Sequence, residues 1–133
     1  MSTTAPHAHE KLFFVYGTLR KGDDNDITRL EPAPRLVGRA CIKGVMHHLG
    51  GYPGVTLGGD QDIVGEVYAV GPVLEAKLDA IESEYPAQAD EYAKRDISVL
   101  VDGQALSCCV YEINPAYTVG KPVIASGDWV KDR

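Results

Sequence analysis

The chain has 133 residues, of which 44% are hydrophobic and 24% are charged, and its formal net charge is -6 at pH 7. These values are typical of a globular chain large enough to bury a hydrophobic core. Its dispersed basic residues argue against binding to nucleic acid or to an anionic membrane surface, and no apolar run approaches the ~20 residues of a membrane span.

The ends of the chain and its cysteines set the expected domain organisation. Residues 1–10 are polar, lack the apolar centre of a signal peptide and predict a flexible N-terminal tail. Residues 11–133 predict a single domain. The three cysteines lack the spacing of a zinc site, and we interpret them as thiols of a reducing cytoplasm. We therefore expect a cytoplasmic protein without a bound metal.

The first strong pattern is the apolar run from Phe13 to Tyr16, which ends abruptly at Gly17. Such a run predicts a short strand buried on both faces. Gly17 lets the backbone turn and lets a ligand approach closely. Thr18 and the neighbouring backbone N–H groups suit the recognition of an anion. The alternative interpretation is that Tyr16-Gly17-Thr18 simply ends the strand.

The middle of the chain predicts loops and extended segments. Residues 21–31 are rich in Asp and predict a loop followed by a helical turn. Residues 35–49 predict an extended segment whose two glycines suit bends or bulges. A dense turn at 50–54 precedes a short strand at 55–57. The second strong strand is predicted at 63–70, where the residues are mostly apolar.

One amphipathic helix is predicted between two prolines. Pro72 suits the first helical position, and Pro86 ends the helix. Between them Leu74, Leu78 and Ile81 recur at i, i+4 and i+7, a spacing that places them on one buried stripe.

A β-hairpin is predicted at residues 97–113, closed by the two-residue turn Asp102-Gly103. This register places Lys94 opposite Tyr111 and gives the hairpin one apolar face. The remaining residues, 115–133, predict irregular structure with one strand before residue 126. One helix against about six strands indicates an α+β fold, a small mixed and mostly antiparallel β-barrel flanked by short helices.

Glu82 is the most informative carboxylate of the chain. It follows Ile81 near the end of the predicted helix, where an apolar pocket and the negative end of the helix dipole would both raise its pKa. Such a carboxyl group suits general base and acid catalysis. The alternative is a solvated helix carboxylate. The sequence shows no recognisable Ser-His-Asp or Cys-His arrangement and no phosphate-binding glycine loop.

Five short motifs in order resemble the gamma-glutamylcyclotransferase/AIG2-like family. The resemblance covers roughly residues 12–113. The motifs are Tyr16-Gly17-Thr18-Leu19-Arg20, Gly51-Tyr52-Pro53, Val64-Gly65-Glu66-Val67-Tyr68, Leu78-Asp79-x-x-Glu82 and Tyr92-x-x-Arg95. The chain departs from many relatives at Ser83, where Gly is common, and at Asp26, where a His is common.

This resemblance implies the small mixed β-barrel and a set of site residues. The loop of Tyr16, Gly17, Thr18 and Leu19 is expected to hold the α-carboxylate of a γ-glutamyl group. Glu82 is expected to be the catalytic acid and base. Tyr111 matches a late tyrosine of the family and is a further candidate for substrate binding.

The expected function is therefore γ-glutamyl cyclotransfer, which releases 5-oxoproline and a free amine. The substrate's own α-amine is the nucleophile, so the chemistry requires no metal or organic cofactor. The expected partner is a small γ-glutamyl compound, and its leaving amine and the oligomeric state stay open. A non-catalytic module of the same fold that binds a γ-glutamyl or related carboxylate ligand is the alternative.

Overall fold

The computed structural model describes residues 10–23, 25–84 and 91–132, except for the side chains of residues 82–84. These residues contain a 6-stranded sheet with the order β3-β2-β4-β1-β6-β5. In chain order the strands are β1 (Lys11–Val15), β2 (Arg35–His48), β3 (Pro53–Leu57), β4 (Gln61–Val70), β5 (Tyr92–Val101) and β6 (Gln104–Ile113). The sheet is mixed, because β1 runs parallel to β6 while the other neighbouring pairs are antiparallel.

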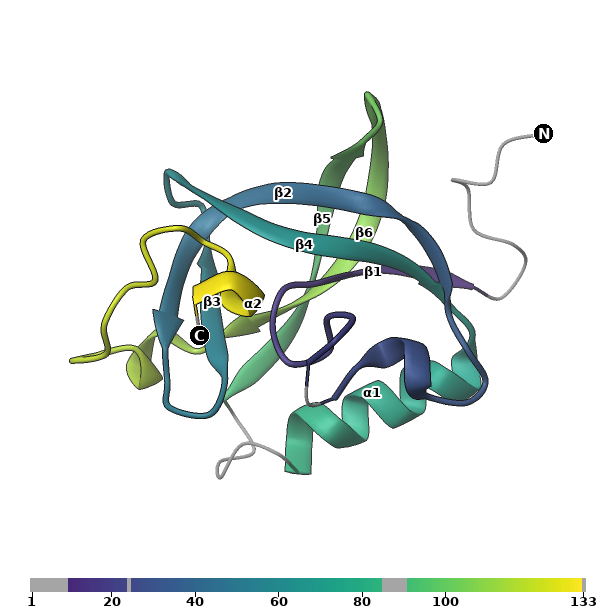
Figure 1. Ribbon diagram of the computed structural model, residues 1–133, viewed down its shortest axis with the longest axis horizontal. Helices are drawn as coiled ribbons and strands as arrows, with labels where there is room; N and C mark the ends of the chain where they lie inside the picture. The colour runs from purple at the N-terminus through teal and green to yellow at the C-terminus, as the bar shows by residue number, and fades with distance from the viewer. Residues whose placement is uncertain (1–9, 24, 85–90, 133) are drawn as a thin grey trace.

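The sheet curls into a half-barrel (Figure 1). The long strand β2 pairs with β4 along its first part and with β3 along its last part. Its register with β4 shifts between Leu36 and Gly38, as expected for a glycine at a bulge. Across the curve β2 contacts β5, and β3 contacts β6. The predicted α+β fold, a small and mostly antiparallel mixed barrel, is confirmed.

Strand β1 runs through the centre of the sheet and separates two hydrophobic clusters. Phe14 belongs to the cluster inside the curve, and Phe13 belongs to the cluster on the outer face. Cys108 and Cys109 divide in the same way, as their alternation along a strand predicts. Burial raises the pKa of the Cys108 thiol to about 11. That thiol is therefore neutral at ordinary pH and packs as an apolar group.

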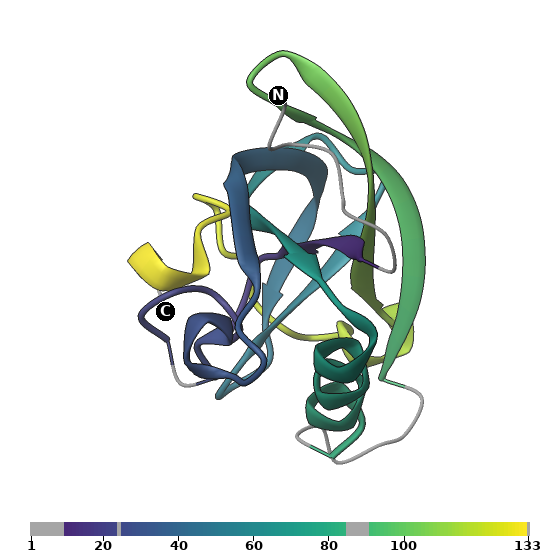
Figure 2. The same cartoon turned by 90° about the vertical axis from the view of Figure 1, so that its right-hand side faces the viewer.

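Helix α1 (Pro72–Glu84) covers the outer face of the sheet (Figure 2). Leu74 and Leu78 are fully buried in the outer cluster, and Ile81 packs against it, so the predicted stripe is confirmed. The loop after β1 joins the same cluster through Ile27 of the short 3-10 helix η1 (Ile27–Arg29). The outer cluster therefore links the β1 loop to α1.

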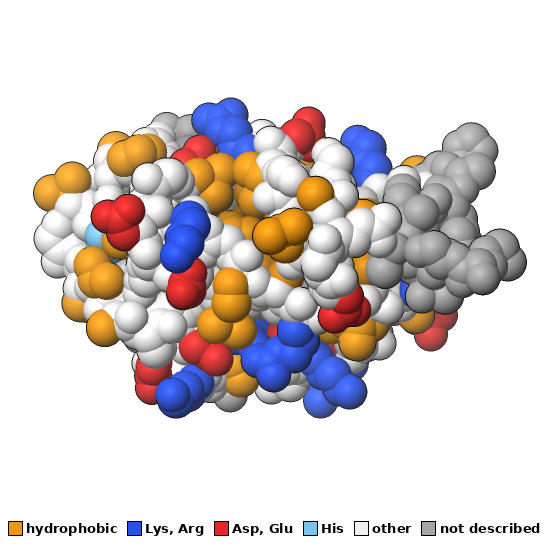
Figure 3. All heavy atoms as spheres, turned by 90° about the horizontal axis from the view of Figure 1, so that it is seen from above, with side chains coloured by type: hydrophobic (Ala, Val, Ile, Leu, Met, Phe, Trp, Pro, Cys, Tyr) orange, Lys and Arg blue, Asp and Glu red, His pale blue; other side chains and the backbone are white. Residues whose placement is uncertain are grey.

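The predicted hairpin of β5 and β6 is confirmed. Asp102 and Gly103 form its turn with φ values of 51° and 81°, and Lys94 pairs with Tyr111. Both turn residues have positive φ, which Asp and Gly tolerate best. The hairpin extends beyond the rest of the sheet (Figure 2). Figure 3 shows the molecule from above the view of Figure 1, and on this face hydrophobic side chains lie among acidic and basic ones.

The C-terminal segment differs from the prediction of one strand. It forms the 3-10 helix η2 (Pro115–Tyr117), a single β-bridge between His47 and Val123, and the short helix α2 (Trp129–Asp132). Trp129 is buried in the inner cluster. A four-residue helix is too short to show helical periodicity in the sequence, and its position is set by the burial of Trp129.

Candidate functional site

A cleft opens where the end of β1 meets the start of β3, helix α1 and the strands β5 and β6. It encloses about 460 Å³ of unoccupied space, counted out to its open mouth. Residues 14–19, Tyr52, Pro53, Ile81, Tyr92 and Tyr111 form its wall.

The structure brings together five of the six residues that the sequence singled out. Tyr16, Gly17, Thr18, Leu19 and Tyr111 all line this one cleft. The first four come from the loop after β1, and Tyr111 comes from β6, which lies beside β1 in the sheet. Residues nearly a hundred positions apart therefore share one site because their strands are neighbours.

The loop after β1 exposes backbone donors. The carbonyl oxygens of Gly17, Thr18 and Leu19 accept hydrogen bonds from the N–H groups of Arg20, Asn25 and Ile27, at 3.0, 2.9 and 2.9 Å. No acceptor among the described residues receives the N–H groups of Gly17, Thr18 and Leu19. We call residues 17–19 the donor loop. Consecutive N–H groups without acceptors form a concave site suited to an anion.

Gly17 is also required by packing. A Cβ atom at this position would lie 2.8 Å from Cγ of Pro53, which also lines the cleft. The rigid proline ring cannot move aside as a flexible side chain would. The glycine thus allows the donor loop to approach the start of β3, which is a constraint that the sequence did not reveal.

The hydroxyl group of Tyr16 belongs to the wall of the barrel. It donates a hydrogen bond of 2.7 Å to the carbonyl oxygen of Tyr111 and accepts one of 3.3 Å from the N–H of Val55. Tyr16 therefore joins β3 and β6 at the base of the cleft. Its side chain is 6% exposed.

Tyr111 is held by a charged cluster on the outer face. Its hydroxyl donates a hydrogen bond of 2.8 Å to Asp79 Oδ1, and Lys94 lies 3.0 Å from the same oxygen. Lys94 also contacts Glu75 at 2.6 Å. Burial works to lower the pKa of Lys94, but the hydrogen bonds to Glu75 and Asp79 outweigh it and raise that pKa. Asp79 thus links α1 to the cleft through Tyr111.

Glu82 lies in the last part of α1, and its side chain falls outside the described residues. Ile81, the residue before it, lines the cleft. Position 82 follows Asp79 by three residues, and residues at this spacing share one helix face. The helix therefore carries position 82 to the side of α1 from which Asp79 contacts Tyr111.

Two further tyrosines of the cleft were not expected as site residues. Tyr52 donates a hydrogen bond of 2.8 Å to the buried carboxylate of Glu91, and Tyr92 donates one of 2.7 Å to the carbonyl oxygen of Pro53. Their ring centroids lie 6.4 Å apart. Both tyrosines belong to the motifs Gly51-Tyr52-Pro53 and Tyr92-x-x-Arg95, which were the available signal. Their neighbouring rings form an aromatic part of the cleft wall.

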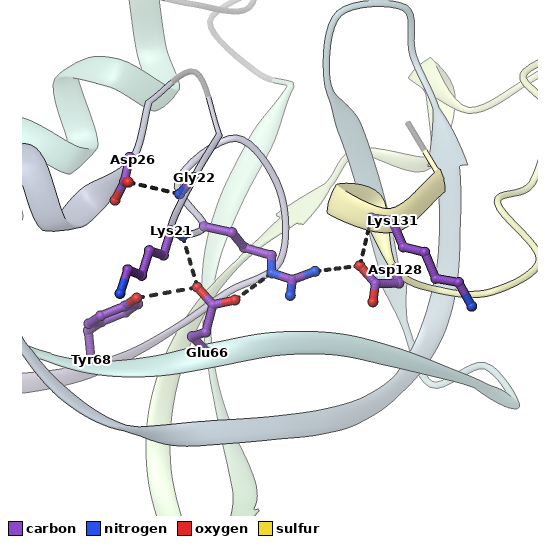
Figure 4. A network of polar contacts seen from close by, with 8 residues as sticks. Lys21, Gly22, Asp26, Glu66, Tyr68, Asp128 and Lys131 are labelled. Carbon is purple, nitrogen blue, oxygen red and sulfur yellow. Dashed lines mark hydrogen bonds and ion pairs between the residues drawn. The ribbon is translucent and has the colours of Figure 1, made fainter.

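Three charged side chains meet next to the donor loop, and Figure 4 labels the two carboxylates among them, Glu66 and Asp128. Arg20 Nε donates to Glu66 at 2.6 Å, and Arg20 Nη1 donates to Asp128 at 2.7 Å. Burial works to lower the pKa of Arg20, but the hydrogen bonds to Glu66 and Asp128 outweigh it and raise that pKa. We call these three residues the Arg20 cluster.

No group of three or more His, Cys, Asp or Glu residues in the described parts of the chain is arranged to hold a metal ion. None of the described helices combines the length and apolar character needed to cross a membrane.

Comparison with known proteins gives consistent matches. A family model described as gamma-glutamyl cyclotransferase, AIG2-like, matches residues 13–131. A Vibrio cholerae protein with a provisional gamma-glutamylcyclotransferase name is 36% identical over 122 residues, which are 90% of this chain and 96% of that protein.

Solved structures show the same fold. The crystal structure of an AIG2-like protein from Mus musculus matches with a TM-score of 0.73 and 26% identity, over 90% of this chain and 89% of that one. YkqA from Bacillus subtilis matches with a TM-score of 0.69 and 29% identity over 92% of this chain. This chain spans 40% of the length of YkqA.

Proposed function

Because the chain belongs to the AIG2-like gamma-glutamyl cyclotransferase family and is an enzyme of that type, we propose that it cyclises the γ-glutamyl group of a small substrate. The substrate is a γ-glutamyl amine or a γ-glutamyl amino acid. The products are 5-oxoproline and the free amine. The observation that carries this proposal is the donor loop, whose residues line one cleft together with Tyr111 and whose three N–H groups have no acceptor among the described residues.

The donor loop is the proposed binding site for the α-carboxylate of the γ-glutamyl group. Its carbonyl groups are all engaged within the loop, so its N–H groups are fixed before the ligand arrives. Preorganised donors bind an anion without a further loss of backbone entropy. The contact of the loop with Pro53 keeps the backbone close to the cleft.

The reaction is an intramolecular acyl transfer. The α-ammonium group loses a proton to Glu82, and the resulting amine attacks the γ-carbonyl carbon to form the lactam C–N bond. The bond from that carbon to the leaving nitrogen then breaks, and Glu82 returns the proton to this nitrogen. The attacking nitrogen also gives up its second proton, which the released amine takes up, so the products are the neutral lactam and the amine as an ammonium ion. No water is consumed. The tethered nucleophile explains why positioning supplies much of the rate, and one carboxylate acting twice contributes about 10²–10⁴-fold.

Asp79 and the aromatic residues have supporting roles in this proposal. Asp79 fixes the phenol of Tyr111 and is itself held by Lys94. Tyr52 and Tyr92 present an aromatic wall whose hydroxyl groups already donate to protein acceptors. This wall suits the carbon chain of the γ-glutamyl group or of the leaving amine.

A panel of γ-glutamyl amines and γ-glutamyl amino acids, assayed for 5-oxoproline, tests the function. Each compound is paired with its α-N-acetyl derivative, in which the nucleophilic nitrogen is blocked. We expect 5-oxoproline from at least one parent compound and none from its acetylated partner. Release of the free amine from the acetylated compound at a comparable rate would identify a hydrolase. Binding of the parent compounds without any turnover would favour the non-catalytic module.

A further inference from the structure

We infer that Asp128 is a positioning residue for the α-carboxylate site, and that it acts on the donor loop through Arg20. This inference rests on the proposed function of the donor loop and adds a residue from the C-terminal segment to it. Asp128 lies 108 positions after Arg20 in the chain, so no local sequence pattern indicates the pair.

The backbone of Arg20 determines the shape of the donor loop. Its N–H donates to the carbonyl oxygen of Gly17 at 3.0 Å, and its own carbonyl oxygen accepts from Asp23 at 3.1 Å. Arg20 therefore belongs to two successive turns. Any movement of its backbone would reorient the N–H groups of residues 17–19, which immediately precede it.

The side chain of Arg20 is held from two sides. Glu66 on β4 accepts from Arg20 Nε at 2.6 Å through one oxygen and from the N–H of Lys21 at 3.0 Å through the other. Asp128 accepts from Nη1 at 2.7 Å. The side chain of Arg20 is 6% exposed, so water does not replace these contacts readily. Its planar fork can satisfy both carboxylates at once.

Asp128 is placed without the help of Arg20. Gly127, the residue before it, has a φ of +68°, and a Cβ there would collide with the carbonyl oxygen of Asp62. Gly127 also accepts a hydrogen bond of 2.9 Å from the N–H of Val64. Asp128 itself caps α2 by accepting from the N–H of Lys131 at 3.1 Å. The C-terminal segment is thus a fixed support on β4, from which Asp128 reaches the guanidinium group of Arg20 (Figure 4).

Positioning and plain electrostatics predict opposite effects when Asp128 loses its charge. Asp128→Asn removes a negative charge from behind the donor loop, which by Coulomb attraction alone would strengthen anion binding. If Asp128 instead holds Arg20 in place, the same change loosens the loop and weakens anion binding. Asn remains a good helix cap, so the variant should keep α2.

The test compares 5-oxoproline with 2-pyrrolidinone, which is the same ring without the carboxylate. Calorimetric titration gives the dissociation constants of both compounds. The ratio of the constant for 2-pyrrolidinone to that for 5-oxoproline isolates recognition of the carboxylate, because a high ratio means that the carboxylate strengthens binding. We expect Asp128→Asn to reduce this ratio by about 10-fold, as for mutations along a coupled network. The KM for the γ-glutamyl substrate should rise by the same factor while kcat changes little, the signature of lost uniform binding.

Two further variants control this experiment. Asp132→Asn removes the same charge from an exposed position of α2 and should leave the ratio unchanged. Arg20→Lys replaces the planar guanidinium group, which can bind two carboxylates at once, by an ammonium group. This change should also lower the ratio. The double variant with Asp128→Asn should lower it little further, because both changes break one interaction.

The outcomes separate this inference from the proposed function. Suppose that the unaltered protein turns over its substrate and that the folded Asp128→Asn variant has an unchanged or increased ratio. This result would overturn the positioning role of Asp128 and leave the proposed function intact. If the unaltered protein releases no 5-oxoproline and binds it no more tightly than 2-pyrrolidinone, both proposals are wrong. A reduced ratio together with a raised KM supports both.

Discussion

Among the carboxylates of α1, Asp79 already has two partners in the cleft region. It accepts a hydrogen bond from the phenol of Tyr111 and pairs with the ammonium group of Lys94. A carboxylate held in this way orients its partners. We therefore propose orientation of Tyr111 for Asp79 and proton transfer for Glu82, one helical turn further on.

Replacement of Glu82 by Gln tests this assignment. The amide keeps the size of the side chain but cannot exchange a proton, so turnover should fall by at least ~10²-fold. Glu84→Gln should be nearly neutral, and Asp79→Asn should lie between the two. Initial rates of 5-oxoproline release measure the effect, and urea midpoints measure folding. A folded Glu82→Gln variant that keeps most of its activity would contradict the assignment.

At the scale of an element, the loop between β1 and β2 is organised by Asp26. This residue is 6% exposed and accepts from the N–H of Gly22 at 2.8 Å and from the hydroxyl of Thr28 at 2.6 Å. It also caps η1 through the N–H of Thr28. Burial works to raise the pKa of Asp26, but these hydrogen bonds outweigh it and lower that pKa.

The lowered pKa of Asp26 predicts a pH-dependent stability. The folded-state pKa lies below the unfolded value of about 3.9, so the stabilisation by Asp26 is present above that value and is lost as the pH falls through the folded-state pKa. Asp26→Asn should lower the free energy of unfolding by about 1–2 kcal/mol at neutral pH, because the amide has one acceptor oxygen in place of two and no charge to strengthen these hydrogen bonds. Urea unfolding between about pH 7 and pH 2.5 should show the two proteins differing in their free energy of unfolding at neutral pH. This difference should become smaller only at acidic pH, where Asp26 takes up a proton. A constant difference over the whole range would contradict the role of the Asp26 charge.

The elements also show what local sequence can predict. The hairpin follows from its two-residue turn, because Asp102 and Gly103 both need positive φ. The burial of Leu74 and Leu78 follows from helical spacing. Helix α2 could not be predicted, because its position depends on the burial of Trp129 in a core built from distant strands.

At the scale of the whole molecule, strand order assembles the site. Strand β1 lies between β4 and β6, so the donor loop at its end has Tyr111 on one side and the Arg20 cluster on the other. The five sequence motifs contain most of the residues that line this cleft. The contacts of Arg20 with Glu66 and Asp128 could not be predicted, since they span 46 and 108 positions. Such pairs become visible only when the fold brings their strands together.

In the proposed reaction the substrate's own nitrogen, and not water, attacks the γ-carbonyl carbon. The most direct test is turnover of an active γ-glutamyl compound in ¹⁸O-labelled water, followed by mass analysis of the products. Cyclotransfer keeps the original carbonyl oxygen, so we predict 5-oxoproline without ¹⁸O. Glutamate that carries one ¹⁸O atom as the main product would show attack by water and would contradict the account.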